Sequence, residues 1–172
     1  MAPRTAAVLL AAAVAAACSH GSTSGPGSGA AEPCAGFHGS LEGLERASCA
    51  GAGGALLLHY TMSGVTGAEG AQLCESGVLS WFRGADSARI RLETAQVRSF
   101  LESLGLEQLD RVPARVELSR ASNLPSTCVV WREGDRLRAI WVHGALKGSP
   151  PAPPPIVSTV ERIRAFDPWP SP

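Results

Sequence analysis

Five cysteines are the residues of this chain whose type and spacing most clearly suggest chemistry: Cys18, Cys34, Cys49, Cys74 and Cys128. No two of them have the Cys-x-x-Cys spacing that is typical of structural zinc sites, so we expect no metal centre. Because their number is odd, one cysteine is left over once the others are joined as disulfides. Cys18 directly follows an apolar run, which makes it the candidate for a separate role.

The first 17 residues have the order of a bacterial export signal. Arg4 lies in a short N-terminal region, an apolar run covers residues 6–17, and small residues precede Cys18. This run is shorter than the roughly 20 residues that a membrane-spanning helix requires. A retained helical anchor and simple cleavage after Ala17, which would release a secreted protein, remain as alternatives.

Residues 14–18, Val-Ala-Ala-Ala-Cys, resemble the lipobox of bacterial lipoproteins. The resemblance implies that Cys18 carries a diacylglycerol thioether and an amino terminus acylated with a fatty acid such as palmitate. It also implies an outer-membrane location, because Ser19 and not Asp follows the cysteine. The membrane would then be the first partner of the chain.

Residues 18–33 consist of Cys18 and a Gly/Ser-rich stretch that predicts a flexible tether. Residues 34–54 form a small cysteine-flanked segment with too few apolar residues to fold alone. Four cysteines remain, and an even number in an oxidising compartment favours two disulfides. We favour Cys34 with Cys49, which bracket this segment, and Cys74 with Cys128, which lie in two predicted strands.

The other candidate reactive groups form no recognisable motif. His59 and His143 fall on predicted strands that a sheet can bring together, but two histidines without a carboxylate pattern are weak evidence for zinc. The sequence contains no Gly-x-Ser-x-Gly, no Ser-x-x-Lys and no phosphate-binding glycine loop. Its 15 basic and 15 acidic residues leave no positive surplus for nucleic acid. We therefore expect a protein that is not an enzyme and needs no cofactor.

Two tryptophans are a candidate binding patch. Trp131 and Trp141 fall on neighbouring predicted strands, and exposed tryptophans often anchor protein interfaces. Filling of the hydrophobic core is the alternative role for both side chains.

Residues 55–167 predict one α+β domain, and residues 168–172 predict a disordered tail. Alternation of apolar residues with a period of two indicates strands. The predicted strands cover residues 56–62, 71–75, 78–82, 89–93, 127–131 and 136–143, with a short extra strand around Val116. Apolar stripes with helical spacing predict helices over 95–104, capped by Thr94, and over 156–166. We expect an antiparallel sheet of about five to seven strands with two helices packed on one face.

The order of these elements resembles the small bacterial domain typified by emfourin, an inhibitor of thermolysin-type metalloproteases. The matching features include a strand ending in Ser63-Gly64, hairpins at Gly77 and Gly134, and a closing helix preceded by proline. Val65 and Ser126 depart from that pattern, and no inhibitory residue is carried over. The resemblance implies a protein partner, an exported metalloprotease.

The sequence thus favours a cell-envelope lipoprotein with a small, non-catalytic binding module. An envelope hydrolase with a site assembled from loop 106–125 is the first alternative. A passive structural lipoprotein is the second.

Overall fold

The computed structural model describes residues 34, 48–63, 67–84 and 86–166. The predicted signal peptide, the lipidated Cys18, the tether and the tail lie outside these described residues.

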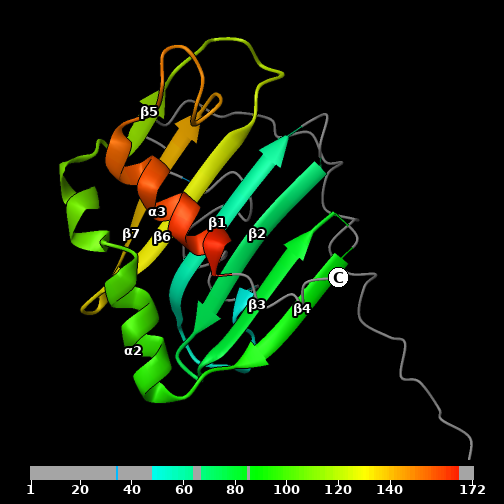
Figure 1. Ribbon diagram of the computed structural model, residues 1–172, viewed down its shortest axis with the longest axis vertical. Coiled ribbons are helices and arrows are strands. Elements are labelled where there is room, and N and C mark those ends of the chain that lie inside the picture. The colour runs from blue at the N-terminus through cyan, green and yellow to red at the C-terminus, as the bar shows by residue number, and fades with distance from the viewer. Residues whose placement is uncertain (1–33, 35–47, 64–66, 85, 167–172) are drawn as a thin grey trace, which may run out of the picture. The chain divides into compact units, whose positions relative to one another are not determined.

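Seven strands form one sheet in the order β4-β3-β2-β1-β6-β7-β5 (Figure 1). The strands are β1 (Ala55–Ser63), β2 (Gly67–Cys74), β3 (Val78–Arg83), β4 (Asp86–Arg91), β5 (Arg115–Glu117), β6 (Ser126–Glu133) and β7 (Arg136–His143). All neighbouring strands are antiparallel except β5, which runs parallel to β7. The predicted α+β class and its sheet of five to seven strands are confirmed.

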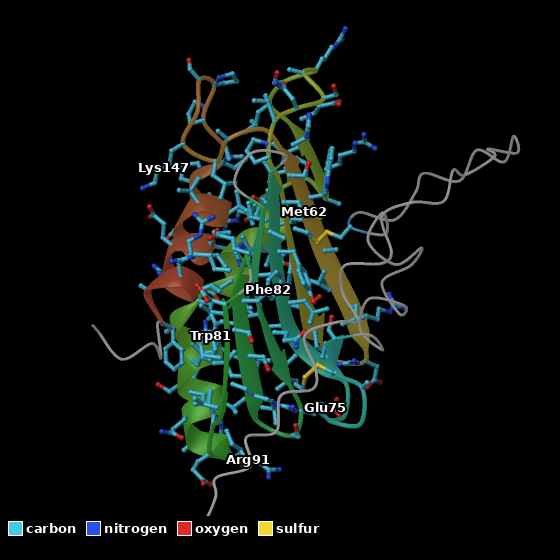
Figure 2. All side chains as sticks on the ribbon, turned by 90° about the vertical axis from the view of Figure 1, so that its right-hand side faces the viewer. Met62, Glu75, Trp81, Phe82, Arg91 and Lys147 are labelled. Atoms are coloured by element: carbon cyan, nitrogen blue, oxygen red, sulfur yellow. A yellow bond between two sulfur atoms is a disulfide. The ribbon has the colours of Figure 1, made fainter. Side chains whose placement is uncertain are left out.

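Among the described residues, two α-helices and a 3-10 helix accompany the sheet: α2 (Thr94–Ser103), η2 (Leu106–Arg111) and α3 (Pro154–Ala165). The N-cap of α2 is Glu93, not Thr94 as predicted, because Glu93 and Gln96 form a reciprocal capping box. Pro154 begins α3, where its missing N–H costs no helical hydrogen bond. Both α-helices lie on the same side of the sheet, seen edge-on in Figure 2.

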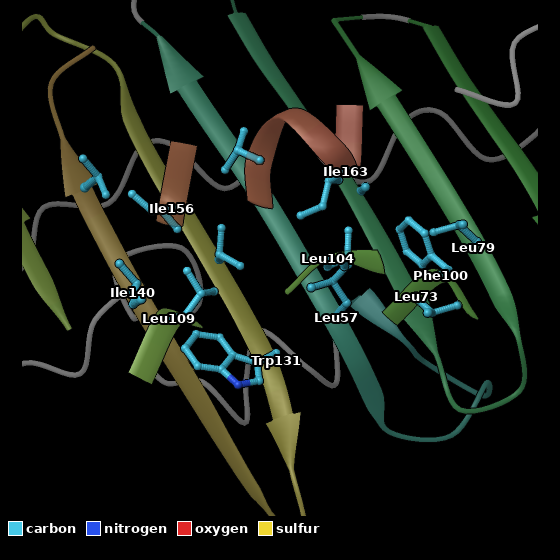
Figure 3. Packing of buried hydrophobic residues seen from close by; sticks show 14 of the residues in the cluster. Leu57, Leu73, Leu79, Phe100, Leu104, Leu109, Trp131, Ile140, Ile156 and Ile163 are labelled. Atoms are coloured by element: carbon cyan, nitrogen blue, oxygen red, sulfur yellow. The ribbon is translucent and has the colours of Figure 1, made fainter. Parts of the chain in front are cut away.

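The main core lies between the sheet and these helices (Figure 3). Ile156, Val160 and Ile163 of α3 are each at most 1% exposed, and burial of such a side chain contributes about 1.5–3 kcal/mol. Buried Thr159 donates a hydrogen bond from its hydroxyl to the carbonyl of Leu104 (3.1 Å). This contact fixes α3 against the end of α2.

A second buried cluster lies on the opposite face of the sheet. It contains Leu58 and Val130 from the two central strands together with the four described cysteines, Cys34, Cys49, Cys74 and Cys128. The consecutive leucines at the start of β1 fit this arrangement, because a strand that is buried on both faces needs apolar residues at odd and even positions.

Candidate functional site

The two disulfides join the N-terminal segment to the sheet. Cys34 is bonded to Cys128 on β6, and Cys49 is bonded to Cys74 on β2, with Cα–Cα distances of 5.8 and 5.7 Å. Disulfide formation is confirmed, but the predicted pairs Cys34–Cys49 and Cys74–Cys128 are wrong. Two disulfides indicate an oxidising, extracytoplasmic compartment.

The order of the strands explains why Cys74 and Cys128 are not bonded to each other. β1 separates β2 from β6, with Cys74 opposite Ala55 of β1 and Cys128 opposite Tyr60 of β1. These two β1 positions are five residues apart, roughly 17 Å at about 3.3 Å per residue. Because a disulfide requires Cα atoms within about 7 Å, Cys74 and Cys128 cannot bond to each other.

The predicted tryptophan patch is wrong, because the two side chains occupy opposite faces of the sheet. Trp131 is 5% exposed and belongs to the main core beneath the helices, where Figure 3 labels it. Trp141 lies directly opposite Cys128 on the other face, where it is half-buried. The guanidinium of Arg115 lies 4.7 Å from the centre of the Trp141 ring.

His59 and His143 are also separated by the sheet. His59 lies opposite Val129 on the face of the main core, whereas His143 lies opposite Ser126 on the other face. The two histidines therefore form no joint site. Among the described residues, no three His, Cys, Asp or Glu side chains are grouped so that they could hold a metal ion.

His59 on β1 is a buried ionisable group that lies close to the C-terminal end of α3. It is 2% exposed, and its Nε2 lies 3.4 Å from the hydroxyl of Thr61. Burial and, as the smaller cause, the positive charge of Arg164 together lower the pKa of His59 from 6.5 to about 3. The side chain is therefore a neutral imidazole in the folded protein at ordinary pH.

Glu69 forms ion pairs with two arginines close to His59. It pairs with Arg164, and its Oε2 lies 3.5 Å from Nε of Arg83. A cavity of about 30 Å³ lies between these groups, His59 and Trp81. That volume has room for water but not for an organic ligand.

A larger groove runs along α3. A cavity of about 500 Å³ lies over the ends of β1, β2 and β6, and a second of about 720 Å³ lies over β5 and the proline-rich connector. Both are lined by Leu146, Lys147, Val157 and Glu161, so we treat them as one feature, the α3 groove. Figure 2 labels Lys147 at this side of the domain.

The α3 groove is largely apolar in its larger cavity, whereas the smaller cavity is also lined by the charged side chains of Glu69, Arg83 and Arg164. Val116, Leu118 and Ala152 line the larger cavity, and an ion pair between Lys147 and Glu161 stands where the two cavities meet. The side chains of this pair are 72% and 48% exposed. An exposed pair contributes at most about 1 kcal/mol, so a ligand can displace it at little cost.

A hydrogen-bonded chain of three groups lies on the opposite face of the sheet. Ser126 Oγ lies 3.0 Å from Nδ1 of His143, and Nε2 of His143 lies 2.8 Å from the carbonyl oxygen of Ala121. The His143 and Trp141 rings are stacked with centroids 5.5 Å apart and an angle of 5° between their planes. Ala121 belongs to the loop that the sequence assigned to an alternative hydrolase site.

Ser126 lies in no local sequence motif, because its contact with His143 depends on pairing between strands. The pairing of Ser126 with His143 could nevertheless be predicted from the register of the hairpin at Gly134. Gly134 has a φ of 57°, which suits the tight turn and sets Glu133 opposite Arg136. Counting outward from that pair places Ser126 opposite His143.

No protein-family model matches this chain, and no curated protein sequence matches it either. In the part of the chain that the structure describes, no helix is both long enough and apolar enough to cross a membrane.

Proposed function

We propose that this chain is a cell-envelope lipoprotein of the outer membrane, anchored through Cys18, whose α+β domain binds a protein partner, a role that needs no catalytic step. The anchor is supported by the lipobox-like sequence and by the cysteine pairing. Four of the five cysteines are joined to one another, which leaves Cys18 available for lipidation. Several acyl chains acting together hold a protein stably at a membrane.

Cys18→Ser is expected to abolish incorporation of labelled palmitate and to move the protein from the membrane fraction to the soluble fraction. The substituted hydroxyl cannot form the thioether to diacylglycerol. Fractionation of cells that express either form, followed by immunoblotting, measures the shift. A Ser19→Ala variant is the matched control and should stay in the membrane fraction. Membrane association of Cys18→Ser equal to that of the unmodified chain would reject the anchor.

The α3 groove is the observation that carries the binding role. Each cavity volume lies in the range of ligand sites, and a lining of both apolar and charged side chains suits a chain segment that carries both kinds of side chain. The resemblance to the emfourin domain narrows the partner to an exported metalloprotease. The proposed occupant is therefore an extended segment of that protease.

The full chain is expected to slow a thermolysin-type protease, measured as hydrolysis of a peptide substrate at increasing molar excess of the chain. Val157→Gln is expected to weaken inhibition at least about tenfold, since it places a polar group in the groove wall; that ratio corresponds to about 1.4 kcal/mol. Val97→Gln makes the same change at a partly buried site on α2, outside the groove. The melting temperatures of both variants show whether the fold is retained.

Unchanged proteolysis at high excess would reject the protease as partner. Equal inhibition by Val157→Gln and Val97→Gln would reject the α3 groove as the binding surface.

A further inference from the structure

The hydrogen bonds around His143 define which of its nitrogens carries the proton. The carbonyl oxygen of Ala121 can only accept a hydrogen bond, so in the neutral form of the ring Nε2 is the donor across the 2.8 Å contact. Nδ1 is then unprotonated and accepts a hydrogen bond from the hydroxyl of Ser126 at 3.0 Å. Ser126, His143 and the Ala121 carbonyl therefore stand in the order of nucleophile, base and orienting acceptor.

Rigid elements hold this order in place. Ser126 and His143 are directly opposite each other on β6 and β7, so the sheet register fixes their separation. Trp141 stacks on the imidazole from the same strand, and Arg115 covers Trp141. The backbone N–H of Gly144 donates to the carbonyl of Pro125 (2.8 Å), which ties together the chain on either side of the pair. Preorganisation of this kind is what a reactive site requires.

The surface beside Ser126 offers an apolar contact. Met62 lies directly opposite Ser126 on β1 and is 41% exposed. Directly opposite residues of an antiparallel pair project from the same face with Cβ atoms about 5 Å apart. Ser126 and His143 are themselves half-buried, so both residues are partly exposed beside Met62.

We propose that Ser126 is an acyl-accepting nucleophile with His143 as its general base, and that its substrates are activated carboxylic esters with a small apolar acyl group. This inference does not depend on the proposed binding function. It develops the alternative of an envelope hydrolase and assigns that activity to a face of the sheet away from the α3 groove.

The reaction balances with water as the only co-reactant. Ser126 Oγ bonds to the ester carbonyl carbon while its proton passes to Nδ1 of His143. Collapse of the tetrahedral intermediate breaks the bond to the leaving oxygen, which takes the proton from Nδ1. Water then attacks the acyl-serine, gives a proton to Nδ1, and releases the carboxylic acid as that proton returns to Ser126 Oγ. A positioned general base accelerates such steps by about 10² to 10⁴.

The test uses a fluorophosphonate probe, which reacts covalently with base-activated serines. The purified full chain is expected to be labelled at Ser126, located by mass spectrometry of peptides, and to hydrolyse p-nitrophenyl butyrate. Ser126→Ala should lose both signals, and His143→Gln should lower the labelling rate about 100-fold, as expected when the base is removed. Ser158→Ala, on α3 across the sheet, is the matched control and should retain both.

The ¹⁵N chemical shifts of His143 distinguish a reactive Ser126–His143 pair from a purely structural contact. In mildly alkaline buffer, the ¹⁵N chemical shifts of His143 should place the proton on Nε2, and Ser126→Ala should shift the Nδ1 resonance. Labelling that is absent, that occurs at another serine, or that is equally fast in a folded His143→Gln variant would overturn the proposal. A proton on Nδ1 would overturn it as well, because that nitrogen could not accept the proton of Ser126.

Discussion

Replacing Cys34 and Cys128 together by alanine is expected to lower the free energy of unfolding by about 4–5 kcal/mol. The disulfide closes a loop with a sequence separation of 94, and the chain-entropy model assigns about 4.7 kcal/mol to a loop near 100 residues. Without the bond, the Cys49–Cys74 disulfide is the covalent crosslink that remains between the described cysteines and the sheet. Denaturant unfolding of the oxidised full chain, monitored by tryptophan fluorescence, measures the loss.

The second disulfide supplies the matched comparison. Cys49 and Cys74 are separated by 25 positions, for which the same model gives about 3.5 kcal/mol, so Cys49→Ala with Cys74→Ala should cost less. Each double variant should keep its other disulfide, which peptide mapping under non-reducing conditions detects. A larger loss from the shorter loop would contradict the entropic account. Recovery of a Cys34–Cys49 peptide from the unmodified chain would contradict the connectivity.

Stability is also expected to fall as pH is lowered from 6.5, because of His59. Its pKa is about 3 in the folded protein and 6.5 as the ordinary value, so between these limits the unfolded chain binds a proton that the folded chain excludes. The free energy of unfolding therefore decreases by up to about 1.4 kcal/mol per pH unit as pH falls. Between pH 6.5 and about 5, where carboxylates remain largely ionised, the expected loss is up to about 2 kcal/mol.

Two variants test whether His59 causes this dependence of the free energy of unfolding on pH. His59→Gln removes the titrating ring and should flatten the dependence above pH 5, whatever its effect on stability at neutral pH. Arg164→Gln removes the smaller of the two causes and should keep most of the slope, because burial of His59 is the larger one. Urea unfolding at a series of pH values measures both. A slope that persists in His59→Gln would assign the dependence to other groups.

The strands and helices of this fold were largely predictable because their signals are local. Alternation along β1 and β7, and the apolar stripe of α3, lie within single elements. The run of three leucines at 56–58 also indicates that both faces of the sheet are covered. Alternation alone predicts one buried face for that run, whereas the structure buries Leu57 on one face and Leu58 on the other.

The cysteine pairing and the tryptophan patch depended on information that the local sequence does not carry. Cysteine partners are determined by strand order, and here β1 lies between β2 and β6. Trp131 and Trp141 lie ten residues apart on two strands, and the turn at Gly134 places them on opposite faces. The same register brings Ser126 to His143, a contact that counting from the turn would have found.

The Cys34–Cys128 bond also determines how the domain bears mechanical load. If the chain is tethered before Cys34, tension enters the fold at Cys128 through a covalent bond and bypasses the peptide chain between these residues. β6, which receives the tension, is hydrogen-bonded to β1 on one side and to β7 on the other. The force path from the tether into the fold therefore begins at β6, and reduction of this one bond would move its entry point to Cys49, which lies 15 positions after Cys34 and is bonded to Cys74 on β2.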